Sequence, residues 1–428
     1  MVTRWRAALA ALVALVLVGA PAARAARWGS AAGGVIASEQ PRGDLEGHHK
    51  HKEPYGRPLI GILTQPCHDC PGDSYVAAAF VKWVELSGAR AVPIHFRKSD
   101  AELKRVFKSI NGIVFPGGLT WLWLDAPYVI TARKLFKWAL EANDKGDVFP
   151  IWGTCLGFQL LHILVSDVSR NDLLIETDSV AHPTTLEWAE DVREKSALLE
   201  DMPDDLFDGL ADPDQNIAMQ NHEYGLPPHH YDKWPVLNDW FRILSTSVDR
   251  NGTEYVSTME ARKYPFFGSQ WHPEKPPFEF AMTEVPHSAN AIGVSQYLAN
   301  KFVSFARQSK HRPESLEMEL EMVMNNFQAV FTAREEPDPE NYDGPDMTYF
   351  FGTPGLPPEP VGPQPDDGPS PDDPDNNKPH FPHHHKHDDD PDDGDDTDDD
   401  DDDPPSRGDH HHGHGKYVEA GPRPWMWA

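Results

Sequence analysis

The chain has 428 residues and a formal net charge of −30, from 38 Lys and Arg against 68 Asp and Glu. Much of the negative excess lies in residues 361–410, which hold 19 Asp against three Lys or Arg, so the remainder is only mildly acidic. The composition therefore excludes a basic footprint for nucleic acid, and the three cysteines exclude a scaffold held together by many disulfides.

The first 25 residues have the pattern of a secretory signal peptide. Residues 1–6 carry two arginines, Ala7–Val18 is apolar, and Ala23-Arg24-Ala25 fits an A-x-A cleavage site. The apolar run is shorter than the ~20 residues of a membrane-spanning helix, and no later segment qualifies. We therefore expect a protein that enters the secretory pathway without a membrane anchor. Residues 26–56, polar and rich in Gly and His, are predicted to be a flexible N-terminal segment.

Short strands alternate with amphipathic helices from residue 58 onward. The predicted strands are Leu59–Gln65, Ala91–Phe96, Gly112–Phe115 and Val148–Trp152. The predicted helices are Tyr75–Ser87, Ser99–Ser109 and Val129–Asn143, and the second opens with a capping-box pattern, Ser99-Asp100-Ala101-Glu102. This order is typical of an α/β fold with a central, mostly parallel sheet covered by helices on both faces. Ligands bind such sheets beyond the carboxyl ends of the strands.

Two of the three cysteines form a C-x-x-C, Cys67-His68-Asp69-Cys70, in the loop after the first predicted strand. A structural zinc site needs about four ligands, and the chain has no second cysteine pair. The pair is therefore expected to form a local disulfide or to remain as two free thiols, and no metal site is predicted. Cys155 is left without a cysteine partner.

Cys155 lies where a strand is predicted to turn sharply into a helix. Residues 153–157, Gly-Thr-Cys-Leu-Gly, follow the apolar run Val148–Trp152 and precede the apolar helical pattern Phe158–Val165. A cysteine between glycines on such a turn is typical of a nucleophile elbow, and the N-terminus of the following helix favours its thiolate form. Taken alone, the pentapeptide is equally compatible with a buried, unreactive cysteine.

A second string, Gly268–Lys275, supplies possible partners for Cys155. His272 is a candidate base, and Glu274, two residues further on, is a candidate for the carboxylate that orients it. Nucleophile, base and orienting group are the three parts that covalent acyl transfer needs. An isolated His-x-Glu is usually an ordinary surface feature, but together with the elbow it indicates a catalytic triad.

A pair of glycines follows another predicted strand. Gly117 and Gly118 come directly after Gly112–Phe115 and Pro116, and their N–H groups can donate to a developing oxyanion. The N–H group of Leu156, next to the nucleophile, is the natural second donor. An ordinary turn is the alternative for either glycine. Because these residues follow strand ends, we expect one site at one edge of the sheet, without a metal or cofactor.

The second half of the domain has a different pattern, with strand-like runs joined by short turns. The predicted strands are Asn216–Gln220, Phe241–Val248, Glu254–Ala261 and Phe266–Trp271. They favour antiparallel additions at one edge of the sheet. Two more helices are predicted, Ala289–Gln308 and Glu314–Thr332, and the folded domain is expected to span residues 57–351. Asn251-Gly252-Thr253, in a polar turn, is an N-glycosylation sequon.

Residues 352–428 form a tail dominated by Pro, Gly and Asp, a composition that cannot bury enough apolar surface to fold. Histidines at 383–387 and 410–414 lie among the Asp runs. Free His and Asp side chains bind divalent ions weakly. A solvated, charged tail is the favoured interpretation, so no metal site is predicted here either.

Together these residues resemble the gamma-glutamyl hydrolases, cysteine peptidases of the class I glutamine-amidotransferase-like superfamily. The elbow and the His-Pro-Glu string are common to the superfamily, whereas other strings match the family itself. They are Pro58–Gln65, Phe80–Glu85 with Ser87–Pro93, Ser257–Glu260 with Lys263–Pro265, and Ser288–Ala291 with Tyr297–Ala299. The resemblance covers roughly residues 55–350, is weakest over 171–250, and implies the superfamily fold.

The resemblance implies hydrolysis of gamma-glutamyl bonds in folate and antifolate polyglutamates, in an extracellular, lysosomal or vacuolar location. Cys155 would be the nucleophile, His272 the general base and Glu274 the carboxylate that orients it. His222, in the string Asn221-His222-Glu223-Tyr224, matches a further active-site histidine. A homodimer is compatible with the resemblance, which leaves the oligomeric state and the choice between endo- and exo-cleavage open.

The substrate implied by the resemblance is polyanionic, so cationic side chains are expected at the mouth of the site. Lys275, Lys263 and Arg262 are near the base in the sequence and are the candidates. Two alternatives stay open: a hydrolase of other gamma-glutamyl amides or peptides, and a non-enzymatic scaffold with an acidic interaction tail. A glutaminase subunit that feeds ammonia to a synthetase is disfavoured, because a signal peptide separates it from cytosolic partners.

Overall fold

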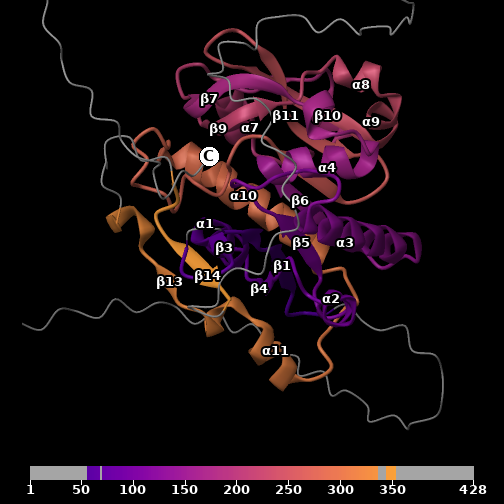
Figure 1. Cartoon of the computed structure of the whole chain (residues 1–428). Coiled ribbons are helices and arrows are strands. Elements are labelled where there is room, and N and C mark those ends of the chain that lie inside the picture. Colours follow the sequence, from indigo (N-terminus) through magenta and orange to yellow (C-terminus); the bar gives the residue numbers. More distant parts are fainter. Residues whose placement is uncertain (1–54, 68–69, 336–343, 353–428) are drawn as a thin grey trace, which may run out of the picture. The chain divides into compact units, whose positions relative to one another are not determined.

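The computed structural model describes residues 55–67, 70–335 and 344–352 (Figure 1). The chain divides into two units, residues 1–51 and 52–428, and every described residue belongs to the second. The predicted signal peptide (1–25) and most of the predicted N-terminal segment therefore lie outside the described residues. So does the predicted tail, apart from Gly352.

An eight-stranded sheet lies at the centre of the described domain, in the order β4-β1-β5-β6-β12-β11-β10-β8 (Figure 1). The first five strands in this order are parallel: β4 (Arg90–Ile94), β1 (Leu59–Leu63), β5 (Gly112–Phe115), β6 (Ile151–Thr154) and β12 (Phe266–Ser269). The last three are antiparallel: β11 (Glu254–Ala261), β10 (Phe241–Val248) and β8 (Glu187–Trp188). The prediction of a mostly parallel sheet with antiparallel strands added at one edge is confirmed. The run Phe266–Trp271 was wrongly placed among those additions, because it contains β12, which lies parallel to β6.

Helices cover both faces of the sheet because the strand side chains alternate between two apolar cores. On one face, Leu59, Leu63 and Ile113 pack with residues of α2 (Asp100–Phe107), α3 (Pro127–Asp144) and α4 (Leu156–Ser166). On the other, Ile60, Ile62 and Val114 pack with residues of α1 (Ala78–Glu85) and α10 (Ala289–Ala306). Burial on both faces explains why these short strands are continuous apolar runs rather than alternating ones.

Local signals set several boundaries as predicted. The capping box at the start of α2 is formed, with the Ser99 side chain accepting from the Glu102 N–H group. The nucleophile strand begins later than predicted, at Ile151 rather than Val148, because Pro150 has no N–H group with which to join the ladder. The strand β6 ends at Thr154, two residues later than predicted, because Gly153 and Thr154 still pair with neighbouring strands, and Cys155 follows it directly.

The helix predicted over Tyr75–Ser87 begins three residues late. Its first residues belong to β3 (Ser74–Ala77), which pairs with β2 (Gln65–Pro66) and with β14 (Thr348–Phe351). Together with β13 (Ala329–Val330) these strands form a four-stranded sheet of order β13-β14-β3-β2. Pairing with the distant β14 satisfies the backbone of Ser74–Ala77, and this tertiary contact overrides the local helical pattern.

The helix predicted over Glu314–Thr332 is also wrong in length. The segment forms α11 (Leu316–Met322), the 3₁₀ turn η1 (Met324–Asn326), strand β13 and a second 3₁₀ turn, η2 (Thr332–Glu335). The Asn326 side chain donates to the carbonyls of Leu320 and Glu321, so it satisfies groups that a continuing helix would have used. Pairing of β13 with β14 then fixes the extended segment.

The region from 171 to 250 contains a strand pair outside the central sheet. Its strands are β7 (Ile175–Thr184), which the sequence did not indicate, and β9 (Ala218–Gly225). The run Asn216–Gln220 was predicted to be a strand added at the edge of the central sheet. This prediction is wrong, because part of the run belongs to β9, which pairs with β7 instead. Short helices complete the region: α5 (Arg170–Leu173), α6 (Val192–Lys195), α7 (Asp204–Ala211), α8 (His230–Lys233) and α9 (Pro235–Trp240).

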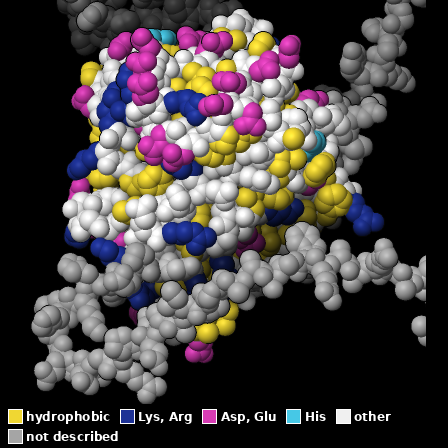
Figure 2. Space-filling view, turned by 180° about the vertical axis from the view of Figure 1, so that it is seen from behind, with side chains coloured by type: hydrophobic (Ala, Val, Ile, Leu, Met, Phe, Trp, Pro, Cys, Tyr) yellow, Lys and Arg dark blue, Asp and Glu magenta, His cyan; other side chains and the backbone are white. Residues whose placement is uncertain are grey.

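The surface of the domain carries both signs of charge. Figure 2 shows Lys and Arg side chains interspersed with Asp and Glu on one face, with no continuous basic area there. Among the described residues, no helix is long and apolar enough to cross a membrane. Within the same residues, no group of three or more His, Cys, Asp or Glu side chains is arranged to hold a metal ion.

Candidate active site

Cys155 occupies a strained turn between β6 and α4. Its backbone has φ 50° and ψ −108°, a conformation that costs a non-glycine residue about 1–3 kcal/mol. The turn is tight because a Cβ on Gly157 would lie 1.9 Å from the Phe115 carbonyl oxygen, so only glycine fits there. The Cys155 N–H group donates to the Ser269 carbonyl of β12 at 2.7 Å. Cys155 is thereby fixed to the strand that leads to His272.

His272 and Glu274 follow β12 and form a buried pair. The imidazole Nδ1 lies 2.6 Å from Glu274 Oε1, and both side chains are at most 4% exposed. With Nδ1–H donating to the carboxylate, Nε2 is the nitrogen left for the thiol. The two halves of the site meet at Gly117, where an added Cβ would lie 2.7 Å from His272 Cε1 and 3.2 Å from Cys155 Cβ.

The charges around His272 favour its protonated form. Burial lowers its pKa, but the charges of Glu274 and Cys155 and the hydrogen bond to Glu274 raise it by more, to about 9. The imidazolium and the N-terminus of α4 both bring positive charge to the surroundings of Cys155, which is the N-cap residue of that helix. The arrangement can therefore hold a proton for a leaving group next to the sulfur.

Candidate oxyanion donors surround the sulfur. Leu156 is the first residue of α4, so its N–H group is among those that the helix leaves unpaired. Gly117 and Gly118 lie in the loop after β5 and line the cavities beside Cys155 and His272. A backbone donor in such a position stabilises a tetrahedral oxyanion by about 3–4 kcal/mol.

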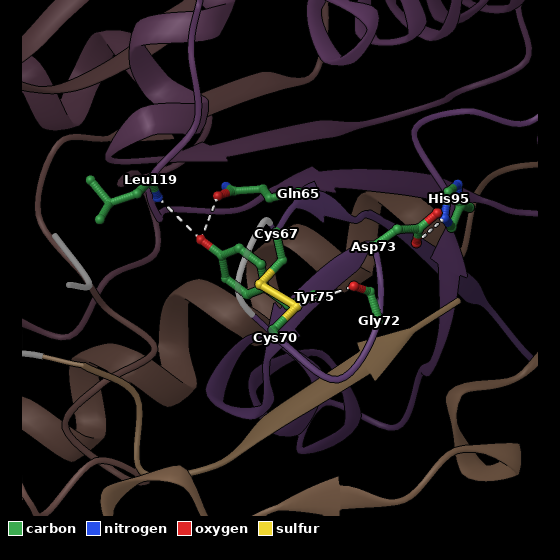
Figure 3. The surroundings of a disulfide bond; sticks show 8 residues. All are labelled: Gln65, Cys67, Cys70, Gly72, Asp73, Tyr75, His95 and Leu119. Carbon is green, nitrogen blue, oxygen red and sulfur yellow. Dashed lines mark hydrogen bonds and ion pairs between the residues drawn. A yellow bond between two sulfur atoms is a disulfide. The ribbon is translucent and has the colours of Figure 1, made fainter. Parts of the chain in front are cut away.

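The glycine loop is held by two side chains that the sequence did not indicate. Gln65 Nε2 donates to the carbonyls of Pro116 and Gly117, both at 3.1 Å. The Tyr75 hydroxyl donates to Gln65 Oε1 at 2.9 Å and accepts from the Leu119 N–H group at 3.1 Å (Figure 3). Because Gln65 and Tyr75 belong to β2 and β3, this hairpin positions the loop that carries the glycines.

The same hairpin carries the disulfide. Cys67 and Cys70 are bonded, which decides between the two alternatives left by the sequence, and Cys155 is a free, buried thiol. Figure 3 shows the Tyr75 ring beside this disulfide, with its hydroxyl directed toward Gln65 and Leu119. The disulfide therefore closes the hairpin next to the residues that hold the glycine loop.

A pocket of about 430 Å³ opens over Cys155. It extends from the ends of β4 and β5 across Cys155 to β9. Its lining comprises Pro66, Phe96, Arg97, Gly118, Leu119, Thr120, Trp121, Ala126, Pro127, Tyr128, Cys155, Leu156, Gln159, Arg170, Asn221, His222, Glu223 and Tyr224. The volume and the mixture of apolar walls with a few polar groups suit a small organic ligand.

His222 lies in this pocket wall but carries no charge at neutral pH. Burial and the neighbouring His272 lower its pKa to about 3. Its ring nitrogens lie 3.0 Å from Thr177 Oγ1 and 3.2 Å from Gln220 Oε1. A neutral, hydrogen-bonded ring can shape the pocket, but it cannot serve as a cation for a carboxylate.

The three cations predicted at the mouth lie elsewhere. Lys263 pairs with Asp144 at 2.9 Å, and Arg262 donates to the Asn238 carbonyl, both on the surface. They precede β12, whereas Cys155 follows the parallel strand β6, so they lie at the opposite end of the strands. Lys275 is buried and lines a small cavity behind His272 and Glu274 rather than the large pocket.

These features are the parts of a cysteine-type hydrolase built on a parallel α/β sheet. Residues 58–274 match the Peptidase C26 family. The chain is 39% identical over 280 residues to Gamma-glutamyl hydrolase of Mus musculus, covering 64% of this chain and 86% of that protein. It is 36% identical over 277 residues to Gamma-glutamyl hydrolase 1 of Arabidopsis thaliana, covering 63% and 77%. With Gamma-glutamyl hydrolase of Homo sapiens the identity is 34% over 293 residues, covering 67% and 90%.

The chain therefore belongs to the gamma-glutamyl hydrolase family, Peptidase C26, and is a hydrolase. The family assignment agrees with the sequence prediction. It leaves the roles of individual residues to be argued from the geometry of this chain.

Proposed function

We propose that this chain hydrolyses the gamma-glutamyl bonds of folate poly-gamma-glutamates through a thioester on Cys155. The observation that carries the proposal is the strained cysteine at the base of the pocket, beside a His272–Glu274 pair joined at 2.6 Å. Strain, burial and a carboxylate-bound imidazole have no structural purpose in a scaffold, so they argue against the non-enzymatic alternative.

In the first half-reaction the Cys155 thiolate attacks the gamma-carbonyl carbon and forms a C–S bond. The oxyanion accepts hydrogen bonds from the N–H groups of Leu156 and of Gly117 or Gly118. As the C–N bond breaks, the His272 imidazolium gives its proton to the leaving amine nitrogen, while Glu274 keeps the ring in place. The products are a free amine and a glutamyl thioester.

In the second half-reaction water attacks the thioester, with neutral His272 accepting its proton. The C–S bond breaks, the gamma-carboxylate of the shortened substrate leaves, and the thiolate–imidazolium pair is restored. No metal or cofactor takes part in either step.

We extend the proposal to location and assembly. The signal-peptide pattern of residues 1–25 supports entry into the secretory pathway, with an extracellular, lysosomal or vacuolar destination. Asn251 is exposed in the turn between β10 and β11, which makes the sequon accessible to glycosylation. A homodimer is part of the proposal by resemblance alone.

Incubation of the full chain with folate penta-gamma-glutamate, followed by mass analysis, tests the proposal. We expect products shortened by one or more glutamates, and the pattern separates endo- from exo-cleavage. Gamma-glutamyl amides without a folate group serve as the comparison. Faster turnover of those amides would favour the alternative hydrolase, and no turnover of either by the wild type, with Cys155→Ala as the blank, would reject the enzyme assignment.

A further inference from the structure

Two arginines in the pocket wall have no acidic partner in the described chain. Arg97 and Arg170 both line the pocket over Cys155. The Arg97 guanidinium carbon lies 5.0 Å from the centre of the Phe96 ring, and that of Arg170 lies 3.9 Å from the centre of the Tyr224 ring. Among the described residues, no ion pair or hydrogen bond engages either guanidinium.

Other arginines of the domain differ in this respect. Arg133 pairs with Asp167, Arg193 with Asp204 and Arg242 with Glu260. Stacking on an aromatic ring stabilises a guanidinium through its face and leaves its N–H edge free for a planar, two-pronged acceptor such as a carboxylate. Arg97 and Arg170 are thus preorganised cations without a partner, and both face a pocket.

The two arginines reach the pocket over Cys155 from separate elements. Arg97 follows β4, the outermost strand of the parallel part, and Arg170 stacks on Tyr224 of β9. The β9 carbonyl of Met219 accepts from the His272 N–H group, so this part of β9 lies next to the end of β12. Both arginines and Cys155 therefore line one pocket, with the arginines on elements far apart in the chain.

We propose that Arg97 and Arg170 bind two alpha-carboxylates of a gamma-linked glutamate chain, one on each side of the bond that Cys155 attacks, an inference that rests on the proposed function. A gamma-linked chain presents a free alpha-carboxylate on every residue, which an alpha-linked peptide does not. The pair therefore recognises the negative charge that every gamma-linked residue carries. Glu223, the carboxylate among the described lining residues, is exposed and leaves the wall with a net positive charge.

The test compares two substrates and four variants of the full chain. The substrates are a p-aminobenzoyl tri-gamma-glutamate and the same compound with alpha-carboxamides in place of alpha-carboxylates. Arg97→Gln and Arg170→Gln are each expected to lower kcat/KM for the acid about 10- to 100-fold, mainly through KM. Each should leave kcat/KM for the carboxamide within about 2-fold of the wild-type value. Arg170→Lys keeps the charge without the two-pronged edge and should recover part of the loss. Arg105→Gln, an exposed arginine on α2 outside the pocket, is the matched control and should change neither value.

Analogues with one alpha-carboxamide at a time assign each arginine to one side of the scissile bond. The inference is overturned if Arg97→Gln and Arg170→Gln keep the wild-type kcat/KM for the acid. It is also overturned if, with an unchanged melting temperature, kcat/KM falls equally for the acid and for the carboxamide. Calorimetric binding of tri-gamma-glutamate to full-length Cys155→Ala separates this result from failure of the proposed function. Absence of wild-type turnover would reject the function alone, whereas binding that is insensitive to both arginines would reject the inference alone.

Discussion

The reaction centre and the wall of the pocket are built in different ways. Cys155, His272 and Glu274 are buried and follow the ends of β6 and β12, and backbone hydrogen bonds between strands fix them. The wall that faces a substrate combines residues of helices and of β9 with the loops after β4 and β5, and Trp121 and Leu119 in those loops are 50% and 40% exposed. Rigid strand ends can hold atoms in one geometry, whereas loops can change without disturbing the sheet.

The electrostatics differ in the same way. In and beside the reaction centre, charges lie close together in a buried environment, so pKa values move far. Burial lowers the pKa of His272, but the charges of Glu274 and Cys155 outweigh it and raise the value to about 9, whereas burial and the neighbouring His272 lower the pKa of His222 to about 3. In the wall, Arg97 and Arg170 have aromatic neighbours and no counterion among the described residues. Substitutions in the centre should therefore remove chemistry, and substitutions in the wall should change which substrate is bound.

The largest effect is expected from Cys155→Ala and His272→Ala. Each should lower kcat by about 10⁴-fold or more, because nucleophile and base act as one unit. The double variant should be little worse than either single one, and the fold should survive, because Cys155 loses only one atom. Rates from single-turnover kinetics and melting curves check both statements. A double variant with much lower activity than either parent would show that the two residues act independently.

A smaller loss is expected from Glu274→Gln, about 10²- to 10⁴-fold, because an amide still partly orients the ring. Burial lowers the pKa of His272, and the Glu274 carboxylate opposes that effect, so its removal should let the pKa fall. The alkaline limb of kcat/KM should then move from near pH 9 toward lower pH. Measurement of kcat/KM from pH 5 to pH 10 tests this, and an unmoved limb would exclude Glu274 as the partner that sets it.

The sequence indicated which residues lie together around Cys155 much better than it indicated the lining of the pocket. Cys155, His272, Glu274 and the glycine pair stand in short strings that follow strands, and strand ends of a parallel sheet meet at one edge. Arg97, Arg170 and the pair Gln65 and Tyr75 acquire their positions only when separate segments of the chain meet in space. No local pattern in the sequence carries that information.

The wrongly placed cations show the same limit. Lys263 and Arg262 are fewer than a dozen residues from His272, but the four residues of β12 carry the chain about 13 Å in between. Proximity in sequence across a strand therefore means separation in space. The strands β3 and β7 were missed because their partners, β14 and β9, are distant in the chain.

Trp121→Ala tests how much the pocket wall contributes to substrate binding. Trp121 lines the pocket, is half exposed and stacks on Trp123 with ring centres 5.9 Å apart, which makes it a candidate surface for the aromatic part of a folate. Loss of one stacking contact should raise KM for folate polyglutamates about 3- to 10-fold, with kcat and the KM of a plain gamma-glutamate chain retained. Phe331→Ala, an equally exposed aromatic outside the pocket, is the control. Equal effects on the two substrates would remove Trp121 from folate recognition.

Glu279→Gln measures the cost of buried charge next to the reaction centre. Burial, together with the charges of Asp346 and Glu274, raises the pKa of Glu279 to about 8, while Lys275 and the Asp346 N–H group oppose the shift. The pKa of Glu279 in the folded state lies above its unfolded value of about 4.5. The stability that this group contributes is therefore fully present below pH 4.5 and is lost as pH rises through 8. The glutamine variant should therefore lose less melting temperature between pH 5 and pH 8.5 than the wild type. Glu284→Gln, exposed and nearby, should follow the wild type, and a Glu279→Gln curve parallel to the wild type would contradict the assigned shift.

The smallest effect is expected from removing the tail. A chain ending at residue 355 keeps β14, whose pairing with β3 supports the hairpin of Gln65 and Tyr75. It also keeps Asp346, whose carboxylate accepts from the N–H groups of Phe280 and Ala281 in the segment after Glu274. Its kcat/KM on folate polyglutamate should stay within about 3-fold of the wild type, because no group of the reaction centre is removed. A chain ending at 343 lacks both contacts and should lose activity and melting temperature together. Loss of activity in the 355 chain, with an unchanged circular dichroism spectrum, would mean that the tail contributes directly to the site. The reaction centre would then depend on a segment outside the sheet and the pocket wall.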